Sequence, residues 1–207
     1  MVAKQKRQRA SQKKKEKIMQ ATMQLLLKKG SSTSVSTSDI CAAAYLTRPT
    51  LYHYFKSKRN LLLAVHIQSI ESGLRPYLKR ATSIVDPLER LVYMIHTYTK
   101  EIICLHPELR VLIYDALIMK DKNIKNIRLE WKSHYLLLKE TIAQLQLEGK
   151  IPSDVRPSWV ALFVLGMLTW ITYWLDYTKK SSIDSLVEEA LQFILKGIGI
   201  KNIDTIR

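Results

Sequence analysis

Histidine and cysteine are the side chains that most often hold a transition metal, but their spacing in this chain does not suit that use. Metal-binding motifs typically leave two to five residues between paired ligands, and none of these side chains stands so. The chain also lacks G-x-S-x-G, P-loop and G-x-G-x-x-G motifs. The cysteines are Cys41 and Cys104, and the histidines are His53, His66, His96, His106 and His134. The sequence therefore predicts no metal, no cofactor and no enzyme, which would need convergent titratable groups.

Side chains suited to binding, rather than to catalysis, gather between residues 36 and 58. Two short helices are expected there, over residues 37–44 and 47–55, with Ser36 and Thr47 as their N-caps. The small alanines at 42–44 would let the two helices cross closely. Two such helices joined by a tight turn are typical of a helix-turn-helix that binds DNA.

The second short helix has two faces of different character. Its apolar face, with Leu51, Tyr54 and Phe55, is expected to point inward. The exposed face carries side chains that suit a major groove: arginine for guanine, threonine for phosphate or a thymine methyl group, and tyrosine and histidine for phosphate oxygens. These exposed residues are Thr47, Arg48, Thr50, Tyr52 and His53. The N–H groups at the start of the first helix, Ser36 and Thr37, are a second expected phosphate contact.

Positive charge is concentrated at one end of the chain. The 207 residues carry 33 Lys plus Arg against 18 Asp plus Glu, a net charge of +15, and 14 basic but only 2 acidic residues lie within the first 60. Such segregation indicates a polyanionic partner, either nucleic acid or an anionic membrane. Residues 1–10 are expected to be a disordered basic arm, which would either bind DNA or only keep the chain in solution.

The hydrophobic periodicity predicts helices along the rest of the chain. No Val/Ile/Thr-rich alternating segment bounded by turns is present, so the fold class is all-α, with about nine helices. Two cysteines cannot staple a secreted scaffold and residues 1–17 lack an apolar leader segment, so a cytoplasmic location is expected. Outside the helix-turn-helix, the expected helices run over residues 11–29, 57–76, 87–104, 107–119, 122–147, 157–177 and 183–195.

The stretch TSDICAAAYLTRPTLYHYFKSKRNLLLAV, residues 37–65, resembles the DNA-binding domain of TetR-type transcriptional regulators. The resemblance covers residues 15–65 and implies a three-helix DNA-binding domain joined by a long fourth helix to an all-α domain that binds a ligand and dimerises. Tyr45 departs from the family pattern by standing where a turn glycine is usual, and Pro49 by replacing a small residue at the DNA. The DNA-contacting residues that the resemblance implies are Ser36, Thr37, Thr47, Arg48, Pro49, Thr50, Tyr52, His53 and Lys58.

The run WVALFVLGMLTWITYWL, residues 159–175, carries no charge. Seventeen residues are near the lower limit for crossing a bilayer, so a membrane-anchored protein is one alternative. A helix that is apolar all round also suits the buried core of a bundle or dimer. In the TetR-type reading this helix and the last one form the dimer interface, and Gly166 would permit close approach of a neighbouring helix. The residues expected in that interface are Val160, Phe163, Met167, Leu186, Ala190 and Phe193.

The segment LGMLTWITYWLDY, residues 165–177, further resembles a branch of the family that regulates fatty-acid and sterol breakdown and binds acyl-CoA thioesters. Aromatic residues of the C-terminal domain would then line an apolar tunnel, with basic side chains near a polar head group. Each of these aromatic residues also suits an ordinary core. The candidate pocket residues are His96, Arg110, Tyr114, Arg128, Trp131, Tyr135, Trp170, Tyr173 and Trp174.

Together these observations predict a dimeric repressor that binds double-stranded DNA at a palindromic operator and is released by a small apolar or acyl-CoA-type effector. A regulator of a drug-efflux gene that responds to amphipathic compounds is an alternative. The expected division is a basic arm at residues 1–10, a DNA-binding domain at 11–56 and a ligand-binding and dimerisation domain at 57–207.

Overall fold

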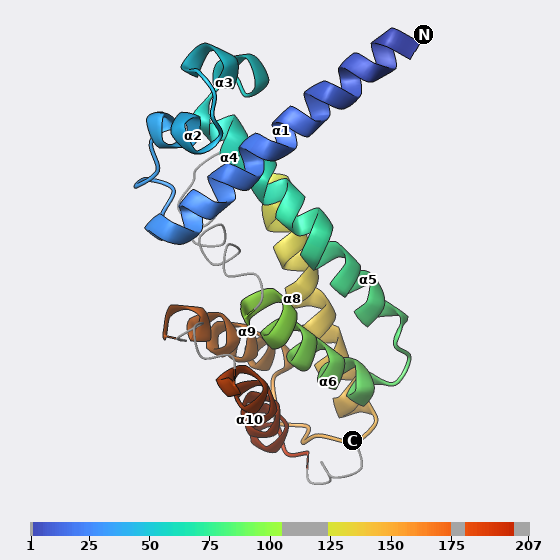
Figure 1. The fold of residues 1–207 in the computed structure, drawn as a ribbon. Helices are drawn as coiled ribbons and strands as arrows, with labels where there is room; N and C mark the ends of the chain where they lie inside the picture. The colour runs from blue at the N-terminus through green and yellow to red at the C-terminus, as the bar shows by residue number, and fades with distance from the viewer. Residues whose placement is uncertain (1, 105–123, 175–180, 201–207) are drawn as a thin grey trace. The chain divides into compact units, whose positions relative to one another are not determined.

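The computed structural model describes residues 2–104, 124–174 and 181–200 (Figure 1). Every regular element among them is a helix, so the all-α prediction is confirmed. The contacts divide the chain into two units. Of the described residues, 2–69 and 124–127 belong to the first unit, and the others, beginning at residue 70, belong to the second.

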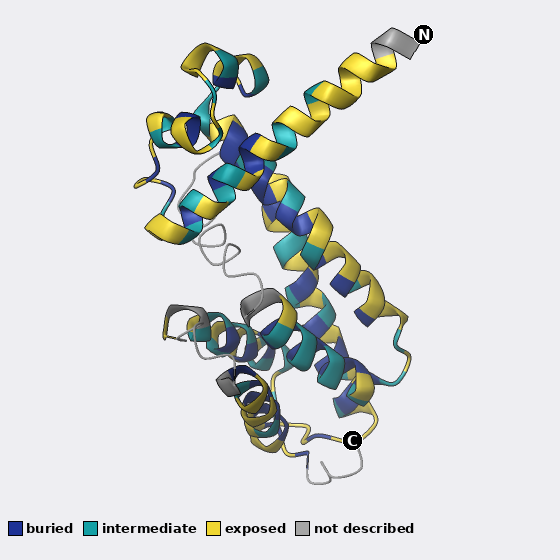
Figure 2. Ribbon diagram, viewed as in Figure 1, coloured by how far each residue is buried: buried dark blue, intermediate teal, exposed yellow. Residues whose placement is uncertain are grey.

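The first helix, α1 (Val2–Lys29), is longer than the sequence analysis expected. The prediction of a disordered arm is wrong, because residues 2–10 form the first turns of this helix. Lysine, arginine, glutamine and alanine favour a helix, and no glycine or proline interrupts the chain before Gly30, whose φ of 70° ends it. Only the C-terminal half of α1 is packed, as Figure 2 shows: its buried residues are Ile18, Met19, Thr22 and Leu26.

In the described part of the first unit, α1 is followed by α2 (Thr37–Ala43), α3 (Arg48–Tyr54) and α4 (Lys58–Ser69). α1 packs against α2 and α4, and α2 packs against α3. Of the alanines expected at the crossing of α2 and α3, Ala42 and Ala43 are exposed and Ala44 is half-buried. The buried apolar side chains of these helices are instead Ile40, Cys41, Leu51, Leu61, Leu62 and Val65, and α4 also buries His66 and Ser69.

The helix that begins at Lys58 does not stop near Pro76 as predicted. It continues through a π-helical stretch, η1 (Ile70–Leu74), into α5 (Arg75–Ser83). Pro76 is tolerated because it lies in the first turn of α5, directly after the wider π turns, where its missing N–H removes no regular helical hydrogen bond. The two units divide at the start of η1, so α4 belongs with α1. The predicted boundary at residue 57 had instead assigned this helix to the C-terminal domain.

Further helical segments of the second unit follow α5 among the described residues. They are α6 (Pro87–Thr97), which continues as the π-helical η2 (Tyr98–Cys104), most of α8 (Ile124–Leu147), α9 (Pro157–Trp174) and α10 (Ser181–Gly197). Asp86 caps α6, accepting hydrogen bonds from the backbone N–H groups of Leu88 and Glu89 at 2.8 Å each. The helix predicted over residues 107–119 lies outside the described residues.

A buried arginine of α6 contacts both α8 and the loop that precedes α6. Arg90 is 8% exposed, and its guanidinium donates hydrogen bonds of 3.0 Å to the carbonyl oxygens of Ile84 and Val85 and to the side-chain oxygen of Gln144. A buried guanidinium needs such partners, since an unpaired one would be costly. The loop between α5 and α6 is therefore fixed against α8.

Within the described ranges, no helix combines the length and the apolar character needed to span a bilayer. The same residues hold no cluster of three or more histidine, cysteine, aspartate or glutamate side chains arranged to bind a metal ion.

Candidate nucleic-acid interface

α3 has the two faces that the sequence predicted. Leu51 is 1% exposed and Phe55 is buried, whereas the ring of Tyr52 is 46% exposed. Thr50 and Tyr54 are half-buried. The predicted contact residues that are exposed at this helix are Thr47, Arg48, Pro49, Tyr52 and His53. The inward face fixes the helix, so the outward face is presented as one surface.

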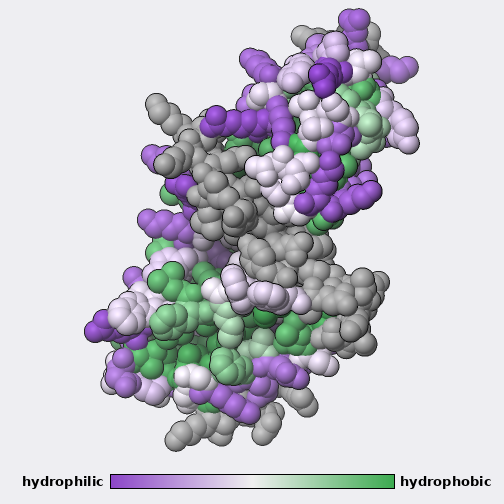
Figure 3. All heavy atoms as spheres, turned by 90° about the vertical axis from the view of Figure 1, so that its left-hand side faces the viewer, coloured by the Kyte–Doolittle hydropathy of each residue, from purple (hydrophilic) through white to green (hydrophobic). Residues whose placement is uncertain are grey.

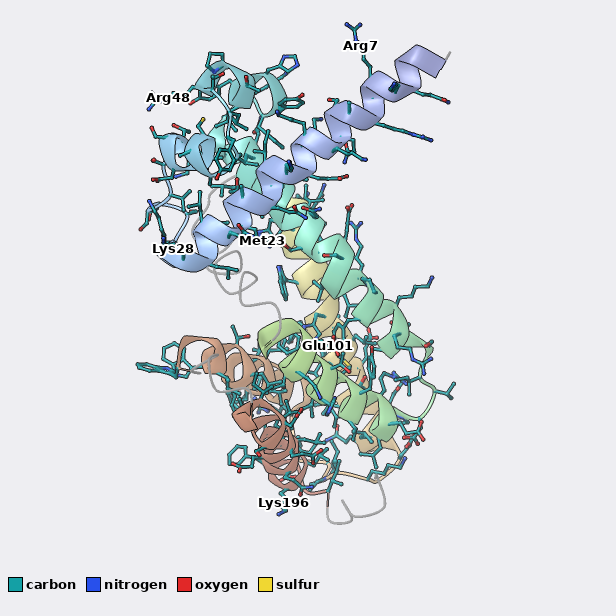
Figure 4. The ribbon with its side chains drawn as sticks, viewed as in Figure 1. Arg7, Met23, Lys28, Arg48, Glu101 and Lys196 are labelled. Carbon is teal, nitrogen blue, oxygen red and sulfur yellow. The ribbon has the colours of Figure 1, made fainter. Side chains whose placement is uncertain are left out.

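Arg48 stands in the first turn of α3, and its guanidinium is held by a contact with the preceding helix. One of its terminal nitrogens donates a 2.6 Å hydrogen bond to the hydroxyl of Ser38 on α2. Both side chains are exposed, and the other donors of the guanidinium remain available. The contact leads the arginine away from α3 toward solvent, as the labelled side chain in Figure 4 shows.

The start of α2 is fixed by a capping box. The Ser36 hydroxyl accepts a hydrogen bond from the Asp39 backbone N–H at 3.1 Å, and the Asp39 carboxylate accepts one from the Ser36 backbone N–H at 2.7 Å. Lys29, at the end of α1, lies 2.7 Å from the same carboxylate. The hydrogen bond from Lys29, followed by those from Ser36, holds the pKa of Asp39 well below its usual range. Asp39 is the single acidic residue between residues 17 and 70, so its pairing with Lys29 leaves the surface positive.

Lys58, a predicted phosphate contact, is part-buried at the start of α4. Its ammonium donates a 2.6 Å hydrogen bond to the carbonyl oxygen of Ser32, in the loop between α1 and α2. A lysine ammonium has three donors. Lys58 therefore holds this loop against α4, and two of its donors are left for other partners.

The turn between α2 and α3 requires a residue in the left-handed region. Tyr45 has a φ of 52°, and its side chain is 93% exposed. Residues with a Cβ are disfavoured there, which explains why a glycine is usual in such a turn. The exposed ring gains little from packing, so the tyrosine places strain in the turn that sets the angle between the two helices.

The geometry of this unit agrees with the comparison of the sequence with protein families. Residues 18–65 match the model of the "Bacterial regulatory proteins, tetR family", and residues 85–198 match that of the "Tetracyclin repressor-like, C-terminal domain". The chain belongs to the TetR family of transcriptional regulators. The resemblance seen in residues 37–65 is thereby confirmed.

Known proteins similar to this TetR-family chain are distant in sequence but cover nearly all of it. The uncharacterised HTH-type transcriptional regulator YvdT of Bacillus subtilis is 23% identical over 192 residues, 89% of this chain and 94% of that protein. The crystal structure of AibR with isovaleryl coenzyme A and operator DNA is 21% identical, with a TM-score of 0.79 over 87% of this chain and 97% of that chain. The crystal structure of FadR from Bacillus subtilis with stearoyl-CoA is 17% identical, with a TM-score of 0.69 over 88% of this chain and 98% of that chain.

The residues predicted to form the effector pocket of the second unit lie in different environments. Arg110, Tyr114 and the side chain of Tyr173 lie outside the described residues, and Arg128 is exposed. Trp170 and Trp174 are 61% and 75% exposed in the single chain, and their place in a tunnel stays a prediction. They lie on the side of α9 opposite its buried residues Ala161, Val164 and Leu168, which places them on its outer face. His96, Trp131 and Tyr135 are half-buried, and the indole N–H of Trp131 is buried without a hydrogen-bond partner among the described residues.

The polar groups at the centre of the second unit were not predicted. The hydroxyl of Tyr77 of α5 lies 2.9 Å from the Nε2 atom of His134 of α8. The ring centres of Tyr98 and His134 are 4.5 Å apart. The Tyr98 hydroxyl is 3.3 Å from the Thr169 hydroxyl of α9. Burial lowers the pKa of His134 to about 3 and raises that of Tyr98 to about 12, so both side chains are neutral. A single histidine in the apolar stripe of α8, with Leu138 and Leu145, is the sequence signal for this cluster.

The outer face of α9 is apolar, which we call the α9 apolar face. Its residues are Trp159, Leu162, Phe163, Gly166, Trp170 and Trp174, and the aromatic and leucine side chains among them are 53% to 75% exposed. A Cβ added at Gly166 would meet no atom within 4 Å. Figure 3 shows hydrophobic side chains gathered over α9 and α10 in the lower part of the view. Of the predicted dimer residues, Phe163 and Phe193 are exposed, Val160, Met167 and Leu186 are half-buried, and Ala190 is buried.

Replacing Tyr45 by glycine should stabilise the first unit. The substitution removes the cost of a left-handed residue with a Cβ, partly offset by the greater freedom of glycine in the unfolded chain, for a net gain of about 0.5–1 kcal/mol. Thermal unfolding followed by circular dichroism measures the change. Ala42→Gly, at an exposed position inside α2, is the control and should lower the stability. A Tyr45→Gly variant that unfolds at a lower temperature than the unaltered protein would show that Tyr45 does not strain the turn.

Proposed function

We propose that this TetR-family regulator is a repressor that binds a palindromic operator as a homodimer and releases it when a small apolar or acyl-CoA-type effector binds. The exposed face of α3, with Arg48 in its first turn, is the observation that carries the DNA-binding part. We further propose that the chain acts by binding alone, without an enzyme activity, and that it does so in the cytoplasm.

The DNA-binding step follows from the side chains on α3. A helix of this size fits the major groove, where the free donors of Arg48 would bind the O6 and N7 atoms of a guanine. Tyr52, His53 and the threonines at 47 and 50 would donate to phosphates, which fixes the register without reading the sequence. Pro49 donates no backbone hydrogen bond and contributes apolar contact only. Thr37 and the free donors of Lys58 would add phosphate contacts beside them. The predicted contact from Ser36 is not available in this structure, because its N–H and its hydroxyl both donate to the Asp39 carboxylate at 2.7 Å.

Replacing Arg48 by alanine should reduce base preference more than general affinity. We expect the preference for a duplex selected from genomic fragments over its scrambled version to fall by about 1–3 kcal/mol. Fluorescence anisotropy with both duplexes measures it.

Lys28→Ala is the control for that variant, because it removes one exposed positive charge from the same unit but away from Arg48 (Figure 4). It should weaken binding to both duplexes alike. An equal effect of both substitutions on the two duplexes would mean that Arg48 binds only phosphate.

The α9 apolar face supports the dimer. Six aromatic, leucine and glycine positions recur at helical spacing, and four large rings exposed to water on one helix form a patch that monomeric proteins rarely leave open. Two-fold dimers bury the same surface on both copies. The glycine at 166 would let two such helices approach closely, so a second copy of the chain is the occupant that suits this face.

Phe163→Glu should dissociate the dimer, because it would place two unpaired carboxylates in the buried centre of the interface. Analytical ultracentrifugation should show the mass of the main species falling from about two chains to one at micromolar concentration. Leu147→Glu, a change at a residue that is 89% exposed at the end of α8, is the control and should remain dimeric. A Phe163→Glu variant that stays dimeric would place the interface elsewhere.

The effector class is supported by the second unit and by its structural relatives. AibR and FadR are described with isovaleryl coenzyme A and stearoyl-CoA, respectively. In this chain the neutral hydroxyls of Tyr77 and Tyr98 and the imidazole of His134 form a polar cluster inside an apolar unit, which suits a carbonyl group with an acyl chain. The described residues around the cluster leave no cavity that would admit even a water molecule, so binding would have to open the helices. A ligand that binds the opened state more tightly would shift the protein toward it.

Stearoyl-CoA or isovaleryl-CoA should raise the unfolding temperature of the protein and release the selected duplex. Free coenzyme A is the control and should do neither, because it lacks the acyl chain. Tyr98→Phe should weaken the acyl-CoA effect about 2- to 10-fold, the value of one hydrogen bond. Release by cationic amphiphiles but not by acyl-CoA would instead favour the regulator of a drug-efflux gene. Calorimetry and anisotropy measure both effects.

A further inference from the structure

The N-terminal half of α1 is a helix that has no core of its own. Residues 2–17 would extend over about 24 Å at 1.5 Å per residue. Residues 5–10 are all exposed, and none of residues 5–17 is buried. The stretch carries eight basic residues and one acidic residue, Glu16, whose carboxylate accepts a 3.1 Å hydrogen bond from Gln12. Its like charges repel one another, so this segment is adapted to a partner rather than to the interior of the protein.

Four of the basic residues form a continuous row, which we call the basic stripe: Lys6, Arg9, Lys13 and Lys17. They recur every three or four residues, so they share one side of the helix. All four are exposed. The buried residues of α1, such as Ile18 and Thr22, lie on the opposite side of the helix by the same periodicity. The packing of α1 on α2 and α4 therefore leaves the stripe free.

We propose that the basic stripe binds the phosphate backbone of duplex DNA beside the operator half-site, which extends the contact beyond α3. The inference rests on the proposed DNA-binding function and adds a second contact surface to it. Four charges within about 17 Å of helix would face a strand that carries one phosphate per 3.4 Å. The stripe has the charge and the length to follow about five phosphates.

The position of the stripe within the first unit agrees with this role. In Figure 1 the N-terminal end of α1 and the whole of α3 lie at the same end of the unit, and the labelled Arg7 and Arg48 in Figure 4 lie there too. The packed part of α1, beginning at Ile18, joins the two surfaces rigidly because it contacts α2, which in turn holds α3.

Duplex DNA suits this helix better than an anionic membrane does. Helices that lie on a bilayer pair a basic face with a face of tryptophan, phenylalanine or leucine. Residues 2–17 offer only Val2, Ala3 and Ala10 as apolar side chains. A surface that is charged without an apolar counterpart binds by releasing counterions from a polyanion.

The salt dependence of DNA binding tests the inference. A variant with Lys6→Gln, Arg9→Gln, Lys13→Gln and Lys17→Gln keeps good helix formers in α1, which circular dichroism checks. Each phosphate contact contributes about 0.9 to the slope of log K against log salt concentration, so the slope should fall by about 3 to 4. Between 50 and 200 mM salt, the affinity of the unaltered chain for the selected duplex should therefore drop about 100-fold more than that of the variant.

A matched control removes four exposed lysines of the second unit: Lys79→Gln, Lys132→Gln, Lys139→Gln and Lys196→Gln. This control changes the net charge by the same amount as the stripe variant, and it should change the slope of log K against log salt concentration by less than one. An unchanged slope in the stripe variant, or equal changes in both variants, would overturn the inference. A stripe variant that no longer binds phosphatidylglycerol vesicles but binds DNA as the unaltered chain does would also overturn the inference.

Two further measurements separate a failure of the stripe from a failure of the proposed DNA-binding function. The double variant Lys6→Gln, Arg9→Gln should give about half the change in slope, since it removes half the stripe. The preference for the selected over the scrambled duplex should survive in both stripe variants, because the stripe binds only phosphates. If the unaltered chain itself shows no such preference, the proposed function fails; if it does and the slope stays unchanged, only the stripe fails.

Discussion

The position of α3 depends on the apolar contact that α1 makes with α2 and α4. α2 and α3 have seven residues each, too few to form stable helices alone. Ile18 and Leu26 of α1, Ile40 of α2 and Leu61 of α4 are all fully buried, and Leu51 brings α3 onto the same core. Because one inward residue of α3 is fixed, the helical period determines which side chains face outward. Any change that loosens α1 would therefore also move the surface that binds DNA.

Polar contacts complete what this small core begins, and they also shape the charge of the surface. The pairing of Asp39 with Lys29 and the hydrogen bond from Lys58 to Ser32 join the ends of α1, α2 and α4. Exposed pairs of this kind add little stability individually. The larger effect of the Lys29 pairing is electrostatic, because it neutralises Asp39, the single acidic residue between residues 17 and 70, while Arg48 and the N-terminal lysines stay exposed. The structural contacts and the attraction to a polyanion therefore do not compete.

The sequence predicted the elements whose signals are local and missed those set by packing. The caps at Ser36 and Thr47 lie where predicted, because capping needs only a short polar side chain before a helix. Residues 2–10 lack an apolar pattern, which predicts a disordered arm. They form a helix nevertheless, because their side chains favour one and because the turns that follow are packed. Trp170 and Trp174 could not be assigned from the sequence, since an aromatic residue on an apolar helix suits a pocket, a core or an interface equally. The cluster around His134 was missed because it joins residues from four helical segments.

Communication between an effector and α3 must pass through the segments shared by the two units. Among the described residues, these are the helix from Lys58 to Ser83, whose π-helical stretch begins at the division, and α8, whose first turn belongs to the first unit. A regular α-helix transmits displacement rigidly, whereas π turns can rearrange with little loss of hydrogen bonding and often occur at functional sites. Tyr77 is buried three residues after η1, beside His134 of α8. A ligand that altered this pair would therefore act on both shared helices together, next to the turns that can most easily change.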